Sequence, residues 1–473
     1  MPLCEESELL GSDRMPNASS IQSGFRFIDL FAGIGGFHHA LQEMGGQCVL
    51  AVELDEECRA VYRASFPEMD PGAIQADIRA LTRTAPDPDA DELDVDEICA
   101  RVPEHEVLCA GFPCQPFSKS GFQQGVRDRT RGTLFFDVMS IVIARQPQLV
   151  ILENVRNLAG PRHADTWATI VESLHDAGYV VSSTPAVLSP HLLSPDEGGA
   201  PQVRDRVFIL AYRAPAGLPV EDRDCEPLVT RAPSPGWNPD RWKIEKLLDD
   251  EVDEERYRLR PAEETWLAAW QAFVQRIPAD VLPGFPIWVD AFKERPEIPP
   301  GTPKWKADFL RKNSELYVAN QRLIDEWLDE EWGPLKQRVR DFPPSRRKFE
   351  WQARKAQPSR ATRDLEGLVA HFRPSGIRVK PPTYLPALVA ITQTSVLGPK
   401  VTGSGFWRRL TPREAARLQG VPFDGFEASG VSDKAIYKQL GNAVNVGVVQ
   451  YAAQALFDAA RVDYGRTSAA QAG

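Results

Sequence analysis

Cys114 stands in the stretch Val107–Gly121 (VLCAGFPCQPFSKSG), where an apolar run of four residues is broken by Gly-Phe-Pro. This pattern predicts a short buried strand followed by a loop, so that the thiol lies just past the carboxyl end of the strand. The two nearby prolines stiffen that loop, and a thiolate held there could act as a nucleophile. A lone cysteine in a proline-rich turn is more often a packing residue. The nucleophile is favoured by the rest of the sequence.

A carboxylate and two guanidinium groups are predicted near the same place. Leu149–Leu152 is continuously apolar, as in a strand buried between helices, and it leads to Glu153. Burying a charged carboxylate at the end of a strand costs free energy unless the group is paired or takes part in chemistry. We favour a chemical role for Glu153. Further along, alternation places Gln202, Arg204 and Arg206 on one face of a strand, where two arginines could hold an anion or an acceptor oxygen.

The elements that would position these groups start with a strand, a glycine turn and a helix. Phe25–Leu30 is apolar, the turn FAGIGG follows directly, and residues 37–44 have the apolar period of a helix. The absent side chains of Gly33 and Gly35 let a ligand approach the backbone, as in nucleotide-binding corners. Taken alone, this signal is weak.

Two acidic residues extend the predicted binding corner. Glu53 ends the next strand, eighteen residues after Gly35, where a carboxylate commonly accepts hydrogen bonds from both hydroxyls of a ribose. The dinucleotide fingerprint requires glycine at position 38, but the sequence has His38, which favours an adenosine cofactor without a pyrophosphate. Asp77 and Ile78 could contact the adenine, although an aspartate that opens a helix is an equally good interpretation.

Composition limits the class of protein. Hydrophobic residues make up 42% of the chain and charged residues 26%, which are ordinary globular values, and the length allows two or three domains. There is no apolar run of membrane-spanning length and no signal-peptide pattern, so we expect a soluble, cytoplasmic protein without membrane contact. The seven cysteines form no Cys-x-x-Cys pair, which argues against a disulfide framework or a zinc site, and no metal is expected.

Charge is distributed unevenly along the chain. The net charge of −11 argues against a protein that coats nucleic acid indiscriminately. Acidic residues are concentrated in Asp87–Glu106, which has the composition of a solvated surface insertion, whereas the stretch from Lys304 to Lys380 is rich in Lys and Arg. If nucleic acid binds, we expect it on that basic side. The tryptophans of this region could be core residues of a helical domain, or aromatics of a DNA-facing module, or both.

Changes in composition divide the chain into five segments. We expect a disordered leader at 1–24, a catalytic and cofactor-binding domain at 25–212, an inserted target-recognition domain at 213–400, a return to the catalytic domain at 401–462, and a disordered tail at 463–473. Thr411-Pro412-Arg413-Glu414 has the form of a helix start, and its helix should stop at Gly420.

Together these stretches resemble the DNA (cytosine-5) methyltransferases of the restriction-modification type. FAGIGG, PCQPFSKSG, ENV, QVRDR and QLGNAV occur in the order of that family's motifs, through most of residues 25–212 and again through 407–460. The resemblance implies an α/β fold of the Rossmann-like class I methyltransferase type. Its mostly parallel sheet would have seven strands, a smaller domain would recognise the target, and the last motif helix would pack beside the first.

The resemblance also implies a role for each catalytic candidate. Carbon 5 of cytosine is too electron-poor to attack a methyl sulfonium unaided, so a nucleophile must first add at carbon 6, and Cys114 matches it. Glu153 matches the residue that protonates or hydrogen-bonds nitrogen 3, with its pKa raised by burial. Arg206 matches the clamp on the exocyclic oxygen, with Arg204 beside it on the same face. The target cytosine would be flipped out of the duplex.

The implied cofactor is S-adenosyl-L-methionine. Positions that match its contacts in the family are Phe31, Gly33, Gly35, Glu53, Asp77, Ile78, Asn442 and Val444. The chain departs from the pattern between Ser189 and Ala200, where its loop is longer than expected, and at Ala443, where Ser is common. The longer loop puts the local geometry of the arginine strand in doubt.

The partner that the resemblance implies is duplex DNA, methylated by a monomer beside a companion restriction endonuclease. Two alternatives stay open. One is methylation of tRNA by the same chemistry, against which the long basic insertion argues. The other is a DNA-binding protein that keeps the fold without the reaction, which would not require Cys114, Glu153 and Arg206 together.

Overall fold

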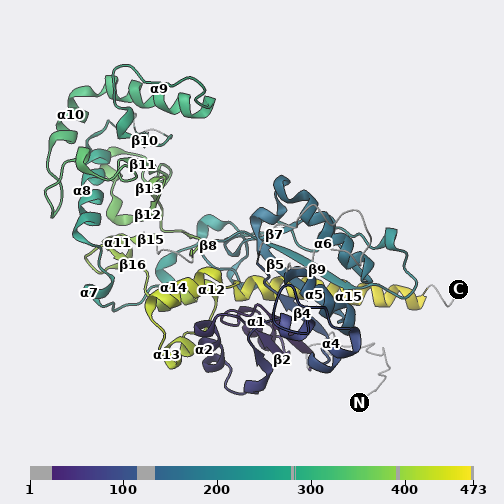
Figure 1. Ribbon diagram of the computed structural model, residues 1–473. Coiled ribbons are helices and arrows are strands. Elements are labelled where there is room, and N and C mark those ends of the chain that lie inside the picture. The colour runs from purple at the N-terminus through teal and green to yellow at the C-terminus, as the bar shows by residue number, and fades with distance from the viewer. Residues whose placement is uncertain (1–23, 114–133, 279–281, 283, 390–394, 470–473) are drawn as a thin grey trace, which may run out of the picture.

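A computed structural model describes residues 24–113, 134–278, 282, 284–389 and 395–469. The chain forms a larger body around one sheet and a smaller body around a second sheet, shown at the upper left of Figure 1. The amino-terminal and carboxyl-terminal segments both belong to the larger body, and the smaller body is built from the middle of the chain.

The larger sheet has the strand order β3-β2-β1-β4-β5-β9-β6, with β7 beside β9 as an eighth strand. Its strands are β1 (Arg26–Leu30), β2 (Gln47–Val52), β3 (Ile74–Gln75), β4 (Val107–Ala110), β5 (Leu149–Val155), β6 (Tyr179–Val181), β7 (Ala186–Leu188) and β9 (Arg206–Arg213). The pairs from β3 to β5 are parallel, whereas β9 is antiparallel to β5, β6 and β7. The predicted mostly parallel sheet is confirmed, although it has eight strands where seven were expected.

One predicted strand of this sheet is interrupted. The sequence predicts a continuous strand from Val180 to Leu188, but β6 and β7 are separate segments that pair with successive parts of β9. Ser182 accepts a hydrogen bond from the backbone amide of Thr184 at 3.1 Å, and Pro185 has no amide hydrogen to donate to a neighbouring strand. The turn therefore breaks the strand without breaking the sheet.

Helices cover both faces of the larger sheet, which explains the continuous apolar strands. Alternate residues of β4 belong to different cores: Val107 and Cys109 lie in one, and Leu108 and Ala110 in the other. The covering helices are α1 (Gly36–Glu43) and α15 (Val446–Ala469) on the first face, and α4 (Val95–Arg101), α5 (Leu134–Arg145) and α6 (Ala164–Asp176) on the second. The remaining helices near the first two strands are α2 (Glu56–Ser65) and α3 (Arg79–Thr82).

The acidic stretch 87–106 is not the solvated insertion that its composition suggests. It contains α4, whose first turn carries a capping box between Asp94 and Glu97. Ile98 and Val102 are buried in the second core against α5. Its acidic residues face solvent while a few apolar ones anchor the helix, so counting charges misses the short apolar face.

The smaller body surrounds a six-stranded sheet with the order β10-β11-β13-β12-β15-β16. Its elements are β10 (Ile287–Trp288), β11 (Lys348–Trp351), β12 (Val369–Arg373), β13 (Gly376–Lys380), β15 (Ser395–Leu397), β16 (Arg408–Arg409), α8 (Pro261–Arg276), α9 (Lys304–Ala319) and α10 (Gln321–Asp329). The sheet extends to Arg409, beyond the predicted return to the catalytic domain at 401. Trp327 and Trp351 are buried in its core, as the packing interpretation requires, whereas Trp305 is 59% exposed.

The last segments return to the larger body. Helices α12 (Pro412–Gln419), α13 (Asp424–Ser429) and α14 (Asp433–Asn442) precede α15, and α12 has the predicted capping box and ends at Gly420. The ring of Phe457 on α15 lies 5.4 Å from that of Phe25, and Gln450 donates to Glu43 of α1 at 2.6 Å. The last motif helix therefore packs beside the first, as predicted.

Helix α15 extends further than its sequence suggests. It runs to Ala469, so 463–469 is helical where a disordered tail was expected. Most of the residues DYGRTSA are weak helix formers, but extending a helix that is already nucleated costs much less free energy than starting one. None of the helices in the described part of the chain is long and apolar enough to cross a membrane.

Candidate functional site

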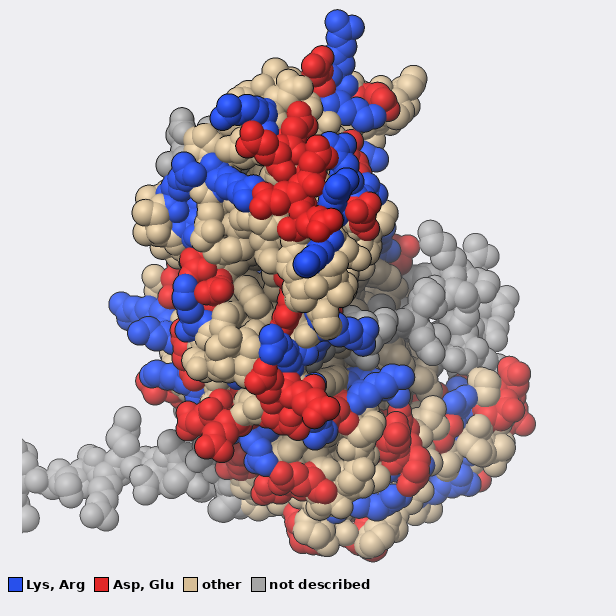
Figure 2. Space-filling view, turned by 90° about the vertical axis from the view of Figure 1, so that its left-hand side faces the viewer, with Lys and Arg blue, Asp and Glu red and all other residues tan. Residues whose placement is uncertain are grey.

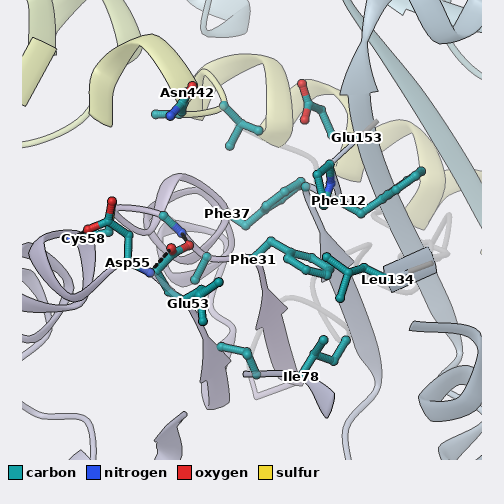
Figure 3. Close-up of a pocket in the computed structure, with 18 of the residues that line it drawn as sticks. Phe31, Phe37, Glu53, Asp55, Cys58, Ile78, Phe112, Leu134, Glu153 and Asn442 are labelled. Atoms are coloured by element: carbon teal, nitrogen blue, oxygen red, sulfur yellow. Dashed lines mark hydrogen bonds between the residues drawn. The ribbon is translucent and has the colours of Figure 1, made fainter. Parts of the chain in front are cut away.

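A cavity of about 470 Å³ lies at the carboxyl ends of β1, β2, β4 and β5. From β1 the chain continues to β2 on one side of the sheet, and from β4 it continues to β5 on the other side. Open α/β sheets form ligand crevices between two such strands. Figure 3 shows Phe31 and Phe37, Glu53, Phe112, Glu153 and Asn442 around it, from segments far apart in the sequence. The cavity is thus the meeting point of the predicted motifs.

The glycine turn after β1 brings its backbone to this cavity. Phe31 has a φ of 60°, which is uncommon for a residue with a bulky side chain, and Gly33 has a φ of 57°. The amide of Gly33 donates to one carboxylate oxygen of Glu53 at 2.8 Å, and the amide of Asp55 donates to the other at 2.8 Å. Each oxygen keeps a further lone pair, so Glu53 is a fixed acceptor that can receive two more hydrogen bonds.

The two glycines of the turn differ in what they allow. Gly33 lines the cavity, and a Cβ there would meet nothing within 4 Å. Gly35 has a φ of 84°, and its Cβ would lie 2.3 Å from the ring of Phe66. Sequence reasoning assigned both to ligand contact, but the structure places Gly35 against the core beneath the turn.

We therefore expect Gly35→Ala to destabilise the protein more than Gly33→Ala does. Gly35→Ala should lower the free energy of unfolding by about 2 kcal/mol or more, because a left-handed alanine is strained and the ring of Phe66 must move. Gly33→Ala should cost less, at about 1 kcal/mol, because only the backbone is strained. Urea denaturation of both variants measures this difference. Equal losses of stability would contradict the assignment.

Asp77 and Ile78 also line the cavity, just after β3. Ile78 is 2% exposed and offers an apolar contact. Asp77 accepts from the backbone amide of Arg79 at 3.0 Å and pairs with its guanidinium at 3.0 Å. Asp77 therefore both lines the cavity and accepts a hydrogen bond at the start of a helix.

The carboxyl-terminal motif closes the opposite side of the cavity. Asn442 and Val444 line it from the end of α14, as Figure 3 shows for Asn442. Val444 lies so close to the start of α1 that a Cβ on Gly36 would be 2.6 Å from it. Lys438 of α14 forms an ion pair of 2.8 Å with Asp55, which caps α2. Lys438 was missed from the sequence, because no local pattern connects it with a residue 383 positions away.

Glu153 and Arg206 form an ion pair at the inner end of the cavity. They lie on the antiparallel neighbours β5 and β9, and Arg206 Nε is 2.9 Å from Glu153 Oε1. Glu153 is 7% exposed. Burial raises the pKa of Glu153, and the attraction of Arg206 opposes that rise without cancelling it. The pair thus combines a carboxyl group inclined to hold a proton with a cation fixed beside it.

The next residue, Asn154, fixes the loop that follows β4. Its side-chain amide donates to the carbonyl of Phe112 at 2.9 Å, and both residues line the cavity. Pro113 lines the cavity too, whereas Cys114 lies outside the described residues. Asn154 was not among the predicted site residues, although its place beside Glu153 in the ENV motif was the available signal.

Arg204 does not share a strand face with Arg206, as the alternation predicted. The chain forms β8 (Gln202–Val203) and then β9 from Arg206, so Arg204 falls between two strands. Its guanidinium is buried and donates to the carbonyls of Gly441 at 2.9 Å and Ala443 at 2.6 Å. Burial lowers the pKa of Arg204 to about 9. Arg204 therefore holds the segment that carries Asn442 and Val444.

The long loop between Ser189 and Ala200 explains this departure. Its Gly198 packs against Gly447 at the start of α15, where a Cβ on Gly198 would lie 2.7 Å from the Cα of Gly447. The loop also supplies the hydroxyl of Ser189, which accepts from the amide of Arg204 at 3.0 Å. It therefore supports the buried arginine from the other side.

The chain is similar to named proteins over most of its length. A family model described as C-5 cytosine-specific DNA methylase matches residues 25–458. Type II methyltransferase M.AluI of Cellulosimicrobium cellulans is 39% identical over 92% of this chain and 92% of that protein. Type II methyltransferase M.HhaI of Haemophilus parahaemolyticus is 36% identical over 40% of this chain and 50% of that protein. A solved Dnmt2 methyltransferase of S. pombe aligns with 92% of this chain at a TM-score of 0.46 and 15% identity.

Proposed function

The chain belongs to the C-5 cytosine-specific DNA methylase family, and from this premise we propose how its cavity methylates a cytosine in duplex DNA. The protein is a DNA (cytosine-5-)-methyltransferase of the type II restriction-modification class. The observation that carries the proposed mechanism is the placing of the Glu153–Arg206 pair and the anchored Glu53 carboxylate around one cavity.

The residues present fit S-adenosylmethionine as the methyl donor. Glu53 can accept from two ribose hydroxyls while the amides of Gly33 and Asp55 keep it in place. Phe31 and Ile78 offer apolar surface for an adenine ring, and Asn442, which also lines the cavity, would hold the amino-acid end. When bound, this cofactor supplies a methyl group on a sulfonium centre.

We expect Glu53→Ala to weaken binding of S-adenosylmethionine by roughly 10- to 100-fold, because hydrogen bonds to a charged group contribute about 1.5–3 kcal/mol. Isothermal titration calorimetry with the full chain measures the dissociation constant. Glu57→Ala is a matched control, since Glu57 is an exposed carboxylate on α2 outside the cavity lining. An unchanged dissociation constant in Glu53→Ala would remove Glu53 from the cofactor site.

The chain's own groups account for the steps on cytosine. The thiolate of Cys114 forms a bond to carbon 6, and the displaced electron pair makes carbon 5 nucleophilic. Glu153 donates its proton towards nitrogen 3, where negative charge would otherwise collect. Arg206 holds the exocyclic oxygen and so orients the ring. After carbon 5 has taken the methyl group, water removes its proton, and the C–H electron pair forms the carbon 5–carbon 6 double bond as the Cys114 thiolate leaves. Nitrogen 3 returns its proton to the Glu153 carboxylate.

The two bodies and Arg204 have separate roles in this proposal. Residues 25–212 and the segment after Arg409 form the catalytic domain, and the smaller body recognises the target sequence. Arg204 is a positioning residue that acts through the carbonyls of Gly441 and Ala443. We further infer that the protein works as a cytoplasmic monomer beside a companion endonuclease.

The substrate is tested by incubating the purified protein with tritiated S-adenosylmethionine and either duplex DNA or tRNA. Label in cytosine of DNA is the expected result. Label in tRNA alone would favour the tRNA alternative, and no label in either would favour a binding protein without activity.

A further inference from the structure

The second sheet has one face that its own core does not cover. Phe349, Ile377 and Phe372 point into the core beneath α8, which lies on the outer side of the smaller body. The alternate residues on the same three strands point the other way and are partly exposed. They are Lys348, Glu350, His371, Arg373, Arg378 and Lys380. This second set, the basic face, carries three cations and one carboxylate, together with Lys380, whose pKa burial lowers to about 7.

The basic face is turned towards the larger body. Val369 belongs to the same face of β12 as His371 and Arg373, and it is buried in the core that contains α1 and α15. Further along the face, the side chains of Arg373 and Arg378 are 22% and 33% exposed. The outer side of the smaller body is different, because Figure 2 shows Asp and Glu interspersed with Lys and Arg over it. Of these two sides, the basic face suits a polyanion that also reaches the catalytic cavity.

Arg378 stands at the centre of the basic face. Its strand, β13, lies between β11 and β12, and its cross-strand partners are Glu350 and His371. Glu350 accepts from Arg378 Nε at 3.0 Å and from Arg373 Nη2 at 2.7 Å. Burial disfavours the charge of Glu350, but the hydrogen bonds and attraction of the two arginines outweigh it, so the pKa of Glu350 is lowered.

The fixed Nε leaves the other edge of the guanidinium available. Within the described part of the chain, neither Nη group of Arg378 makes a hydrogen bond, and the side chain is 33% exposed. Two parallel N–H donors on a rigid strand match the O6 and N7 acceptors that guanine presents in the major groove. Any duplex site that contains the target cytosine also contains guanine.

We propose that Arg378 determines sequence specificity by reading a guanine of the target site, with Glu350 as the positioning residue. This inference rests on the DNA methylation proposed above. A phosphate contact would need the charge of Arg378 but not its planar pair of donors. Replacing Arg378 by lysine should therefore preserve a phosphate contact but not the reading of guanine.

The experiment measures methylation of a duplex library with randomised sequence by the full chain, read by bisulfite sequencing. We expect Arg378→Ala and Arg378→Lys both to reduce the preference for guanine at one position of the target by about 5- to 150-fold, while preferences elsewhere persist. Arg322→Ala is the matched control. It removes a 94% exposed arginine of α10 and should leave the profile unchanged.

Each other outcome has a definite meaning. An unchanged sequence profile with a uniform loss of rate, rescued by Arg378→Lys, would overturn the proposal in favour of a phosphate contact. An unchanged rate and profile would overturn it outright. If the wild-type protein methylates no duplex DNA, or methylates RNA instead, the proposed function fails before Arg378 is tested. Circular dichroism of each variant verifies folding.

Discussion

Replacing Glu153 by glutamine is expected to lower the rate of methylation by about 10²- to 10⁴-fold, the range that general acid catalysis contributes. Glutamine keeps the size of the side chain but cannot transfer a proton to nitrogen 3 of the base. Single-turnover kinetics on duplex DNA measures this effect apart from substrate binding. A rate within about twofold of the wild type would contradict a proton-donating role.

The pH dependence gives a second, independent test of Glu153. Burial raises the pKa of this carboxyl, so the protonated form persists to higher pH than in an ordinary glutamate. The wild-type rate should therefore fall as the pH rises through that raised pKa, and Glu153→Gln should lose this dependence. Glu106→Gln is the control, because it breaks a more exposed ion pair, 2.8 Å to Arg26, outside the cavity lining.

Replacing Cys114 by alanine is expected to reduce methylation to the background level. The remaining groups can hold cytosine, but none of them can supply the electron pair that carbon 5 needs. Cofactor binding and DNA binding should persist, and calorimetry and gel shift measure them. Methylation at more than about one thousandth of the wild-type rate would contradict a covalent mechanism.

The other cysteines provide controls for this variant. Cys58 lines the cavity, but burial raises its pKa to about 12, so it is a thiol and a poor nucleophile at neutral pH. Cys99 donates to the carbonyl of Ala144 at 3.4 Å, beyond the residues that line the cavity. Cys99→Ala should therefore retain full activity.

Local patterns predicted most strands of the sheet and several of the residues around the cavity, and the family resemblance supplied others, such as Asn442 and Val444. Apolar runs such as Leu149–Leu152 are typical of buried strands, and in a parallel sheet the residues that follow such strands meet at one edge. Glu53 and Glu153 were predicted in this way, and the structure brings both to one cavity. Glu153 and Arg206 meet because β5 and β9 are antiparallel neighbours, which alternation within one strand could not predict.

The roles of Arg204, Gly35 and Lys438 could not be predicted from the sequence, because they depend on contacts between segments that are distant in the chain. Arg204 had the correct spacing for a face shared with Arg206, but three backbone carbonyls of later segments bind it instead. Gly35 was interpreted as a ligand contact. The glycine is required instead by the ring of Phe66, which lies at the end of α2 and is distant in the sequence. Lys438 and Asp55 are joined only once the carboxyl-terminal helices return to the first strands.

The central claim is that the Cys114 thiolate bonds transiently to the target base, and a mechanism-based trap tests it most directly. Duplex DNA with 5-fluorocytosine at the target position is incubated with the protein and S-adenosylmethionine, because fluorine cannot leave carbon 5 as a proton does. We expect an adduct that survives denaturation and whose mass places the modified base on Cys114. Active wild-type protein that forms no such adduct, or an adduct retained in Cys114→Ala, would contradict it.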